Sequence, residues 1–195
     1  MMNGTTVKHI SHAIQVMIDL ETTGLKPGCS IVQLAAVACK EFDVLDDWFF
    51  NVKISTSSNA TYGLTPEHGT LAWWQLQDAK VREDVFSGNE DLYEALLQFN
   101  QYIKAMREKN PTRKIVFWAK PARFDFPILE AAYVACNLPL PYTHRDVMDA
   151  RTVFKLYEST VPEVEFKSSQ HNAFDDALNQ AIHLNSILQV FSHGH

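Results

Sequence analysis

The sequence predicts an α/β fold in which a mixed sheet is flanked by helices within a single domain. Three strand-like segments come first, and helical and strand-like segments alternate after them, as a sheet with covering helices requires. A chain of 195 residues, 46% of them hydrophobic, can bury one full core. Because no repeat, low-complexity block or long linker divides the chain, we expect one domain over residues 1–195, with a core at about residues 13–190.

The first part of the chain is expected to form an antiparallel meander. Three segments have the apolar or alternating pattern of strands: residues 13–19, 31–39 and 48–54. Hairpin-type connections are predicted around residues 24–28 and 43–47, because glycine and aspartate favour turns. Residues 55–65 are polar and predict a loop, after which Pro66 opens a helix that runs to about Asp78.

The later elements follow from helical periodicity and from the residues that end helices. Apolar residues recur at helical spacing after Asp91 and predict a helix there: Leu92, Leu96, Phe99 and Ile103. Residues 115–119 have the pattern of a short buried strand. Three further helices are predicted: residues 126–136, 149–157 and 172–188.

The composition limits the classes of function that the chain can serve. A formal net charge of −6 gives no global basic field, which argues against a non-catalytic protein that coats nucleic acid. An enzyme is not excluded, because bound metal ions reverse the sign of a carboxylate-rich cleft. Three cysteines scattered among apolar residues, Cys29, Cys39 and Cys136, predict reduced core thiols. Residues 1–12 show no signal-peptide pattern and no apolar run has membrane-spanning length, so we expect a soluble cytoplasmic protein.

The most informative segment runs from Val16 to Gly24, where an apolar run ends in two acids one residue apart. Because strand side chains alternate between faces, Asp19 and Glu21 are expected to point the same way. Two such carboxylates repel unless a cation lies between them, and divalent cations prefer oxygen ligands. The pattern indicates a metal site suited to phosphodiester hydrolysis. The alternative is a solvated strand edge or a helix cap.

Two later segments add acids and a histidine. Asp125 lies among apolar residues where a helix is predicted to start, so it is either a site residue or an N-terminal cap. His171, Asp175 and Asp176 open the last predicted helix, where acids also favour the helix dipole. A histidine with an ordinary pKa of about 6.5 can accept a proton from water at neutral pH. A neighbouring aspartate can complete a metal site.

Taken in order along the chain, these motifs resemble the DnaQ-like, or DEDDh, family of 3′–5′ exonucleases, which has a ribonuclease H-like fold. The motifs are Asp-x-Glu-Thr-x-Gly, an aspartate before a helix, and His-x4-Asp, and the resemblance covers Val16 to about Leu188. It implies that four carboxylates hold two divalent ions, Mg²⁺ or Mn²⁺: Asp19, Glu21, Asp125 and Asp176. It also implies that His171 is the general base, so that all five residues are catalytic.

The identity of the last acid depends on which rule is applied. Helical spacing alone favours Asp175, which lies four residues after His171 and therefore on the same helix face. The spacing of the family motif selects Asp176 instead, with His171 just outside the regular helix. We follow the family motif and expect Asp176 to be the ligand.

Three further segments narrow the resemblance to one branch of the family. Residues 70–77, 122–129 and 149–152 look like the branch that contains the DexA-type DNA exonuclease of T-even phages and its exoribonuclease relatives in bacteria. The resemblance implies a phage or bacterial protein that acts in the cytoplasm of a bacterium or of a phage-infected host cell. Relatives of this kind are often homodimers, although no sequence feature identifies a partner helix.

The implied activity is removal of nucleoside 5′-monophosphates from the 3′ ends of nucleic acid, mainly single-stranded DNA, by a two-metal mechanism. By the same resemblance, Thr22, Gly24 and Leu25 contact the terminal nucleotide. Trp73 and Trp74 offer surfaces on which bases of a single strand can stack. The alternative for adjacent tryptophans on a helix is that one is part of the core and the other covers the surface.

Two other functions compete with a DNA exonuclease. The first is a 3′–5′ exoribonuclease that trims short RNA or RNA tails, and the choice depends on how the site treats a 2′-hydroxyl group. The second is an inactive nucleic-acid-binding module on the same fold. Such a module is expected to lose one or more acids, whereas all five family positions are occupied in this chain. The sequence therefore favours an enzyme.

Overall fold

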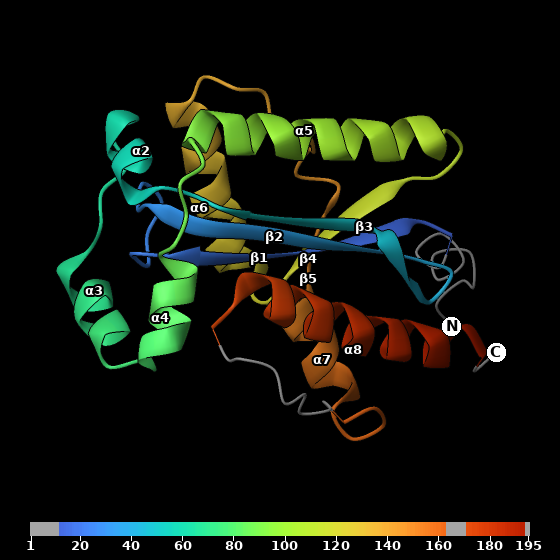
Figure 1. Cartoon of the computed structure of the whole chain (residues 1–195). Helices are drawn as coiled ribbons and strands as arrows, with labels where there is room; N and C mark the ends of the chain where they lie inside the picture. The colour runs from blue at the N-terminus through green and yellow to red at the C-terminus, as the bar shows by residue number, and fades with distance from the viewer. Residues whose placement is uncertain (1–11, 163–170, 194–195) are drawn as a thin grey trace.

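The computed structural model of the chain describes residues 12–162 and 171–193, which are built around a five-stranded mixed sheet (Figure 1). The strands are β1 (Ile14–Thr22), β2 (Ile31–Lys40), β3 (Asp43–Lys53), β4 (Ile115–Ala119) and β5 (Val147–Asp149). Their order is β3-β2-β1-β4-β5, in which β1, β2 and β3 pair antiparallel and β4 is parallel to both β1 and β5. The predicted α/β class and the predicted meander are confirmed.

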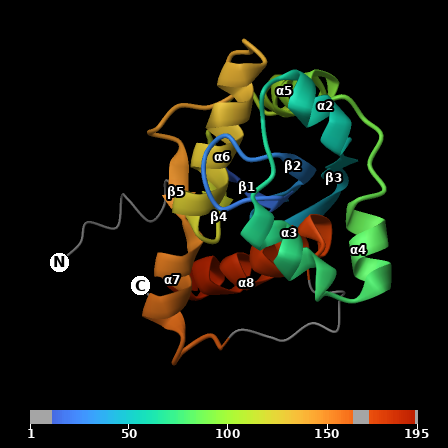
Figure 2. The same ribbon diagram turned by 90° about the vertical axis from the view of Figure 1, so that its left-hand side faces the viewer.

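Helices cover both faces of the sheet and one of its ends. They are α2 (Thr56–Thr61), α3 (His68–Gln75), α4 (Ala79–Val85), α5 (Leu92–Lys109), α6 (Ala122–Ala135), α7 (Ala150–Tyr157) and α8 (Ala173–His193). Helices α5 and α6 pack on one face and α7 and α8 on the other (Figure 1). Figure 2 shows α2, α3 and α4 grouped at the end of the sheet where β1 leads into β2.

Strand β1 contributes to both cores because its side chains alternate. Four apolar residues enter the core under α5 and α6: Ile14, Val16, Ile18 and Leu20. Met17 points to the other face and packs in the core formed with α7 and α8. Asp19 and Glu21 continue the series of Met17, so both acids lie on the face that α8 covers. The predicted common face of the two acids follows from this geometry.

Two connections differ from the sequence predictions. The turn between β2 and β3 lies at Glu41 and Phe42, whose φ angles are 54° and 72°, and not at residues 43–47, which belong to β3. Neither residue is a type that marks a left-handed turn, so the turn had no sequence signal. Residues 55–65 were expected to form a loop, but they contain α2, whose first turn is capped by the Ser55 side chain. Its six residues are too few to show helical periodicity.

Element boundaries near the site also differ from the predictions. Strand β1 extends through both acids to Thr22. Helix α6 begins at Ala122, so Asp125 lies inside its first turn, and the cap position belongs to Pro121. The interpretation of Asp125 as an N-terminal cap is therefore wrong. Strand β5 and helix α4 were not predicted, because three and seven residues are too short to show a pattern.

The three cysteines are buried and unpaired, as predicted for core thiols. Within residues 12–162 and 171–193, no helix combines the length and the apolar character that crossing a bilayer requires. The prediction that residues 1–12 form no signal peptide concerns a segment of which only residue 12 is among the described residues.

Candidate active site

Three carboxylates from two elements meet beneath the end of the sheet. Asp19 and Glu21 of β1 and Asp176 of α8 each offer a ligand oxygen, and these atoms lie within 4.8 Å of one another. Helix α8 comes this close because the facing residues are small and buried: Ala35, Ala173, Ala177 and Ala181. Ala35 pairs directly with Asp19 across β1 and β2, which leaves room for the acids beneath the sheet. The alternative of a solvated strand edge is therefore wrong, since β1 is the central strand.

Asp125 approaches the cluster from helix α6. Its side chain is buried, and one carboxylate oxygen accepts a hydrogen bond from the backbone N–H of Leu20 at 3.2 Å. This N–H lies beyond the last β1–β4 pair, Met17 with Trp118, so no strand competes for it. Asp125 is outside the group of three acids defined by the 4.8 Å limit, but its charge raises the pKa values of both Asp19 and Glu21. The structure thus brings all four predicted acids to one place.

Burial and mutual repulsion hold these acids toward their protonated forms. Burial, followed by the charges of Asp125, Glu21 and Asp176, raises the pKa of Asp19 well above its usual range. Burial and the neighbouring acids raise the pKa of Glu21 to about 8. Burial raises the pKa of Asp125 to about 7, although the Leu20 N–H and Arg151 oppose this shift. Without a cation, these carboxylates repel one another and cannot all be ionised at once. Divalent cations such as Mg²⁺ prefer carboxylate oxygens as ligands, so the residues fit such an ion.

His171 stands next to this cluster, immediately before α8. Its backbone has a φ of 66°, which interrupts helical geometry between it and the helix. Its backbone N–H donates to the carboxylate of Asp176, and its ring lies edge-on to Trp73 with centroids 4.9 Å apart. Because His171 is outside the regular helix, the spacing of four residues does not place Asp175 beside it. The structure brings Asp176 into the cluster of acids.

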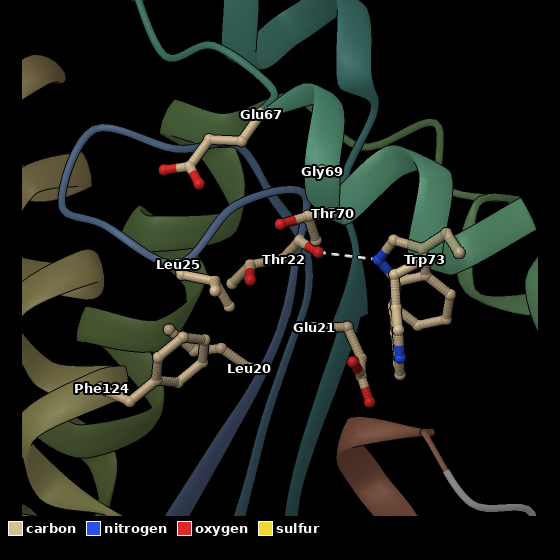
Figure 3. Close-up of a pocket in the computed structure, with 10 residues that line it drawn as sticks. Leu20, Glu21, Thr22, Leu25, Glu67, Gly69, Thr70, Trp73 and Phe124 are labelled. Atoms are coloured by element: carbon tan, nitrogen blue, oxygen red, sulfur yellow. Dashed lines mark hydrogen bonds between the residues drawn. The ribbon is translucent and has the colours of Figure 1, made fainter.

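A cavity of about 460 Å³ opens beside Glu21 (Figure 3). Its lining consists of Leu20, Glu21, Thr22, Leu25, Glu67, Gly69, Thr70, Trp73, Trp74 and Phe124. In Figure 3, Leu25 and Phe124 lie on one side of the cavity and Trp73 on the other. Leu25 is 68% exposed and Trp73 is 40% exposed, so both present apolar surface to an incoming molecule. The predicted substrate residues Thr22, Leu25, Trp73 and Trp74 therefore share one cavity.

The adjacent tryptophans have different environments. Trp74 is 2% exposed, and its indole N–H donates to the backbone carbonyl of Thr22 at 2.9 Å, the contact dashed in Figure 3. This contact ties α3 to the end of β1. Trp73 lies on the open side of the same helix. One tryptophan is thus part of the core and the other covers the surface, as the alternative interpretation stated, while both still border the cavity.

Gly24 does not line the cavity but shapes the loop that does. A Cβ atom on Gly24 would lie 2.5 Å from the Cβ of Cys29 and 2.9 Å from the Cγ of Glu67. Glycine is therefore required for the close approach of the β1–β2 connection to the start of α3. The carbonyl of Gly24 also accepts a hydrogen bond from the Thr22 hydroxyl at 2.7 Å.

Several residues at the site were not identified from the sequence. Glu67, Gly69, Thr70 and Phe124 line the cavity without belonging to any motif of metal ligands. Gln180 donates from its side-chain amide to a carboxylate oxygen of Asp19 at 2.9 Å. A signal for Gln180 existed, because it lies four residues after Asp176 and therefore on the same face of the last helix.

Comparison with known proteins agrees with this geometry. The model of a family described as the 3′-5′ exoribonuclease Rv2179c-like domain matches residues 14–188. No curated protein sequence matches the chain. The solved structures that share the fold include cell-death related nuclease 4 (CRN-4), with a TM-score of 0.66 and 16% identity, covering 92% of this chain and 65% of that one.

Two further structures extend the comparison. The nuclease domain of 3′hExo, a DEDDh family member bound to rAMP, has a TM-score of 0.66 and 12% identity, and the match covers 91% of this chain and 92% of that domain. E. coli Exonuclease I in complex with a dT13 oligonucleotide has a TM-score of 0.60 and 14% identity, covering 94% of this chain and 42% of the larger protein. The chain thus spans about two thirds of CRN-4 and less than half of Exonuclease I. The resemblance to DEDDh exonucleases with a ribonuclease H-like fold is confirmed.

Proposed function

Because the chain belongs to the Rv2179c-like 3′–5′ exoribonuclease domain family, we propose that it removes nucleotides from the 3′ ends of single-stranded RNA with the help of divalent cations. The observation that carries the proposal is the position of the acid cluster. Glu21 belongs both to the group of carboxylates and to the lining of an open, largely apolar cavity. A nucleotide bound in the cavity would therefore have its phosphodiester bond beside the acids.

The acids are proposed to hold two divalent ions, Mg²⁺ or Mn²⁺. Asp19, Glu21 and Asp176 supply oxygens within 4.8 Å of one another, and Asp125 completes the set from α6. When bound, such ions supply positive charge that stabilises the phosphate as it is attacked and makes an attacking water more acidic. The protein contributes carboxylates that are already in place, so little reorganisation is needed when charge develops.

His171 is proposed to accept the proton of the attacking water. Histidine is the side chain that most often serves as a general base in enzymes. The attraction to His171 opposes the rise in the pKa of the Asp176 carboxyl, so the ring lies close enough to the acids to serve a water held there. His171 would then pass the proton to bulk water.

The cavity is proposed to hold the terminal nucleotide. Its volume of about 460 Å³ falls in the range of about 300–1,000 Å³ found for small-ligand sites. A base stacked against Trp73, with Leu25 and Phe124 opposite, would be bound with little sequence preference. Because the rings of an unpaired base are free to stack, this arrangement favours single strands. The hydroxyl group of Thr70, which lines the cavity, is proposed to make polar contacts with the sugar.

Single-stranded DNA is the second candidate substrate. Segments of the sequence resemble the branch that contains a phage DNA exonuclease, and E. coli Exonuclease I, which shares the fold, has been solved with dT13. The family description favours RNA instead. We propose RNA first because that match covers residues 14–188, whereas the resemblance to Exonuclease I rests on the fold.

Matched oligonucleotides test the proposal directly. Single-stranded RNA and DNA of one sequence, labelled at the 5′ end, are incubated with the protein in Mg²⁺, Mn²⁺ or EDTA. We expect a ladder that shortens from the 3′ end only when metal is present, and that forms faster on RNA. A faster ladder on DNA would reverse the order of the two candidates. If neither the RNA nor the DNA is shortened with either metal, the proposal that the protein is a nuclease is rejected.

The setting of the reaction is also proposed from the resemblance. We infer that the protein acts in the cytoplasm of a bacterium or of a phage-infected cell, as a homodimer. Sedimentation equilibrium would test the second point, since a single species with the 22.2 kDa mass of one chain would contradict it.

A further inference from the structure

A row of polar side chains crosses three strands next to the acid cluster. Gln33 of β2 pairs with Glu21 of β1 on one side and with Lys53 of β3 on the other. Residues directly opposite in antiparallel strands project to the same face, so all three side chains point toward α8. Glu21 belongs to the acid cluster, whereas Gln33 and Lys53 contact the segments that precede and flank α8.

Gln33 is fully buried, and both the nitrogen and the oxygen of its side-chain amide form hydrogen bonds. Its side-chain nitrogen donates to Asn51 at 2.9 Å and to Asn172 at 3.2 Å, and its oxygen accepts from the backbone N–H of Ala173 at 3.2 Å. Because a backbone N–H can only donate, this last contact determines the orientation of the amide. Gln33 therefore holds the first residues of α8 against the sheet at a defined position.

Asn172 is held from a second side by helix α4. Its side-chain nitrogen donates to Asp84 at 3.1 Å, while its oxygen also accepts from the backbone N–H of Phe174 at 3.1 Å. Asn172 thus caps α8 and joins it to both the sheet and α4. Asp84 has a further contact, an ion pair with Lys53. No part of this network was identified from the sequence.

The residue before Asn172 is His171, whose backbone is in the left-handed region with a φ of 66°. A non-glycine residue keeps such a conformation only when its surroundings hold it there. The hydrogen bonds of the Asn172 side chain fix the residue that follows His171. The ring contact with Trp73 and the hydrogen bond from the His171 backbone N–H to the Asp176 carboxylate fix His171 itself.

We propose that Gln33, Asn172 and Asp84 are positioning residues for His171. The inference rests on the proposed role of His171 as general base. The network anchors the start of α8 from the sheet and from α4, and so determines where the imidazole stands relative to the acids. Loss of the Asp84 contact would let the imidazole move away, and a general base works only at hydrogen-bond reach of the proton it takes. The network is therefore expected to act on turnover rather than on substrate binding.

Three variants, two at Asp84 and one at Lys53, separate this role from a structural one. The Asp84 side chain is 53% exposed, so its replacement is not expected to unfold the protein. Asp84→Ala removes the acceptor of Asn172, Asp84→Asn keeps an acceptor oxygen but removes the charge that pairs with Lys53, and Lys53→Met removes the ion pair alone. We expect Asp84→Ala to lower kcat about tenfold with KM unchanged, while the other two variants keep kcat near that of the unmodified protein.

Equal losses of kcat in Asp84→Ala and Asp84→Asn would overturn the proposal, because the ion pair rather than the contact with Asn172 would then matter. Unchanged kcat in Asp84→Ala would overturn it as well. Hydrogen exchange of the metal-free protein gives a measurement that does not depend on activity. The backbone amides of Phe174 and Asp175, which Asn172 caps, should exchange faster in Asp84→Ala than in Asp84→Asn.

This second measurement keeps the two proposals apart. If the unmodified protein degrades neither RNA nor DNA, the proposed function fails while the exchange experiment still tests the network. Equal exchange at Phe174 and Asp175 in the two Asp84 variants would show that Asp84 does not hold Asn172, and would reject the positioning role independently of any activity.

Discussion

The two sides of the active site are built in different ways. The acids come from β1, the central strand of the sheet, and from α6 and α8, which pack on its opposite faces. The cavity wall comes from the β1–β2 connection and the short helix α3 at the end of the sheet (Figure 2). Its apolar residues Leu25 and Trp73 remain open to solvent.

This difference separates the chemistry from the contact with substrate. Acids on long packed elements are kept within a small distance of one another, as catalysis requires. A wall of short elements with exposed apolar side chains can adjust to different bases, as a sequence-tolerant exonuclease requires. Substitutions on the first side should therefore abolish turnover, whereas substitutions on the open part of the second should weaken binding.

The largest effects are expected within the catalytic group. Asp19→Ala and His171→Ala should each lower turnover by about a thousandfold or more, since general base catalysis contributes about 10²–10⁴-fold and loss of a metal ligand disrupts the site. Binding of Mn²⁺, measured by calorimetry, should be lost only in Asp19→Ala, because His171 is not proposed as a ligand. Single-turnover kinetics on a labelled strand measures the rates.

Asp175→Asn is the matched control for this pair of variants. Asp175 is adjacent to Asp176 but is not part of the group of acids within 4.8 Å, so its variant should keep both Mn²⁺ binding and turnover. Loss of Mn²⁺ binding in Asp175→Asn would instead support the ligand that helical spacing favours. Retained turnover in His171→Ala would remove the general base from the mechanism.

The part of the site that the sequence predicted is the part whose residue types are dictated by chemistry. Asp19, Glu21 and His171 stood out because the order of their motifs along the chain resembles that of the DEDDh exonucleases, whose ligand and base positions call for these residue types. The facing alanines of α8 and β2 carry no such signal, although they let the acids meet. Glu67 and Gln33 were missed because their positions depend on contacts between segments far apart in the chain, which no local pattern contains.

The fold shows the same division. Strand β4 was predicted with its observed bounds because it is a continuous apolar run between polar segments. The turn at Glu41 and Phe42 was placed wrongly because its left-handed backbone is imposed by the pairing of β2 with β3 and not by glycine or asparagine. Patterns that report burial are thus visible in the sequence, whereas backbone geometry enforced by tertiary pairing is not.

The adjacent tryptophans sharpen the comparison within a single helix. Trp74→Ala should destabilise the fold by about 3–5 kcal/mol, because a buried indole and its hydrogen bond to Thr22 are lost. Trp73→Ala should leave stability nearly unchanged and raise KM about tenfold or more, since stacking contributes about 1–3 kcal/mol per base. It should also lower kcat, because the ring contact with His171 is lost. Urea denaturation and steady-state kinetics measure the two quantities.

Trp73→Phe is the control for the exposed position, because it keeps an aromatic ring and should restore most of the affinity. If Trp73→Ala and Trp74→Ala instead destabilised the fold equally, Trp73 would be a structural residue and the cavity would lack its proposed stacking surface. Unchanged KM in Trp73→Ala, with the fold intact, would also remove that surface.

The last prediction concerns the stability of the metal-free protein, which falls as the clustered acids ionise. Burial and neighbouring charges raise the pKa of Glu21 from 4.5 to about 8 and the pKa of Asp125 from 3.8 to about 7. An acid whose pKa is higher in the folded state favours folding below its unfolded pKa, and this stability is lost as the pH rises through the folded value. In EDTA, Tm should therefore fall as the pH rises from about 4.5 to about 8.

Scanning calorimetry of the metal-free protein measures this decrease, and Asp19→Asn is the informative variant because it removes one of the interacting charges. That variant should be more stable than the unmodified protein in EDTA at pH 8, while gaining less from added Mn²⁺, because a cation stabilises the folded state only in so far as it binds there. An unmodified protein whose Tm rose between pH 4.5 and pH 8 in EDTA would contradict the repulsion among the acids. In that case the clustered acids would not destabilise the metal-free protein. The acids and the exposed cavity wall would then differ only in how rigidly their elements are packed.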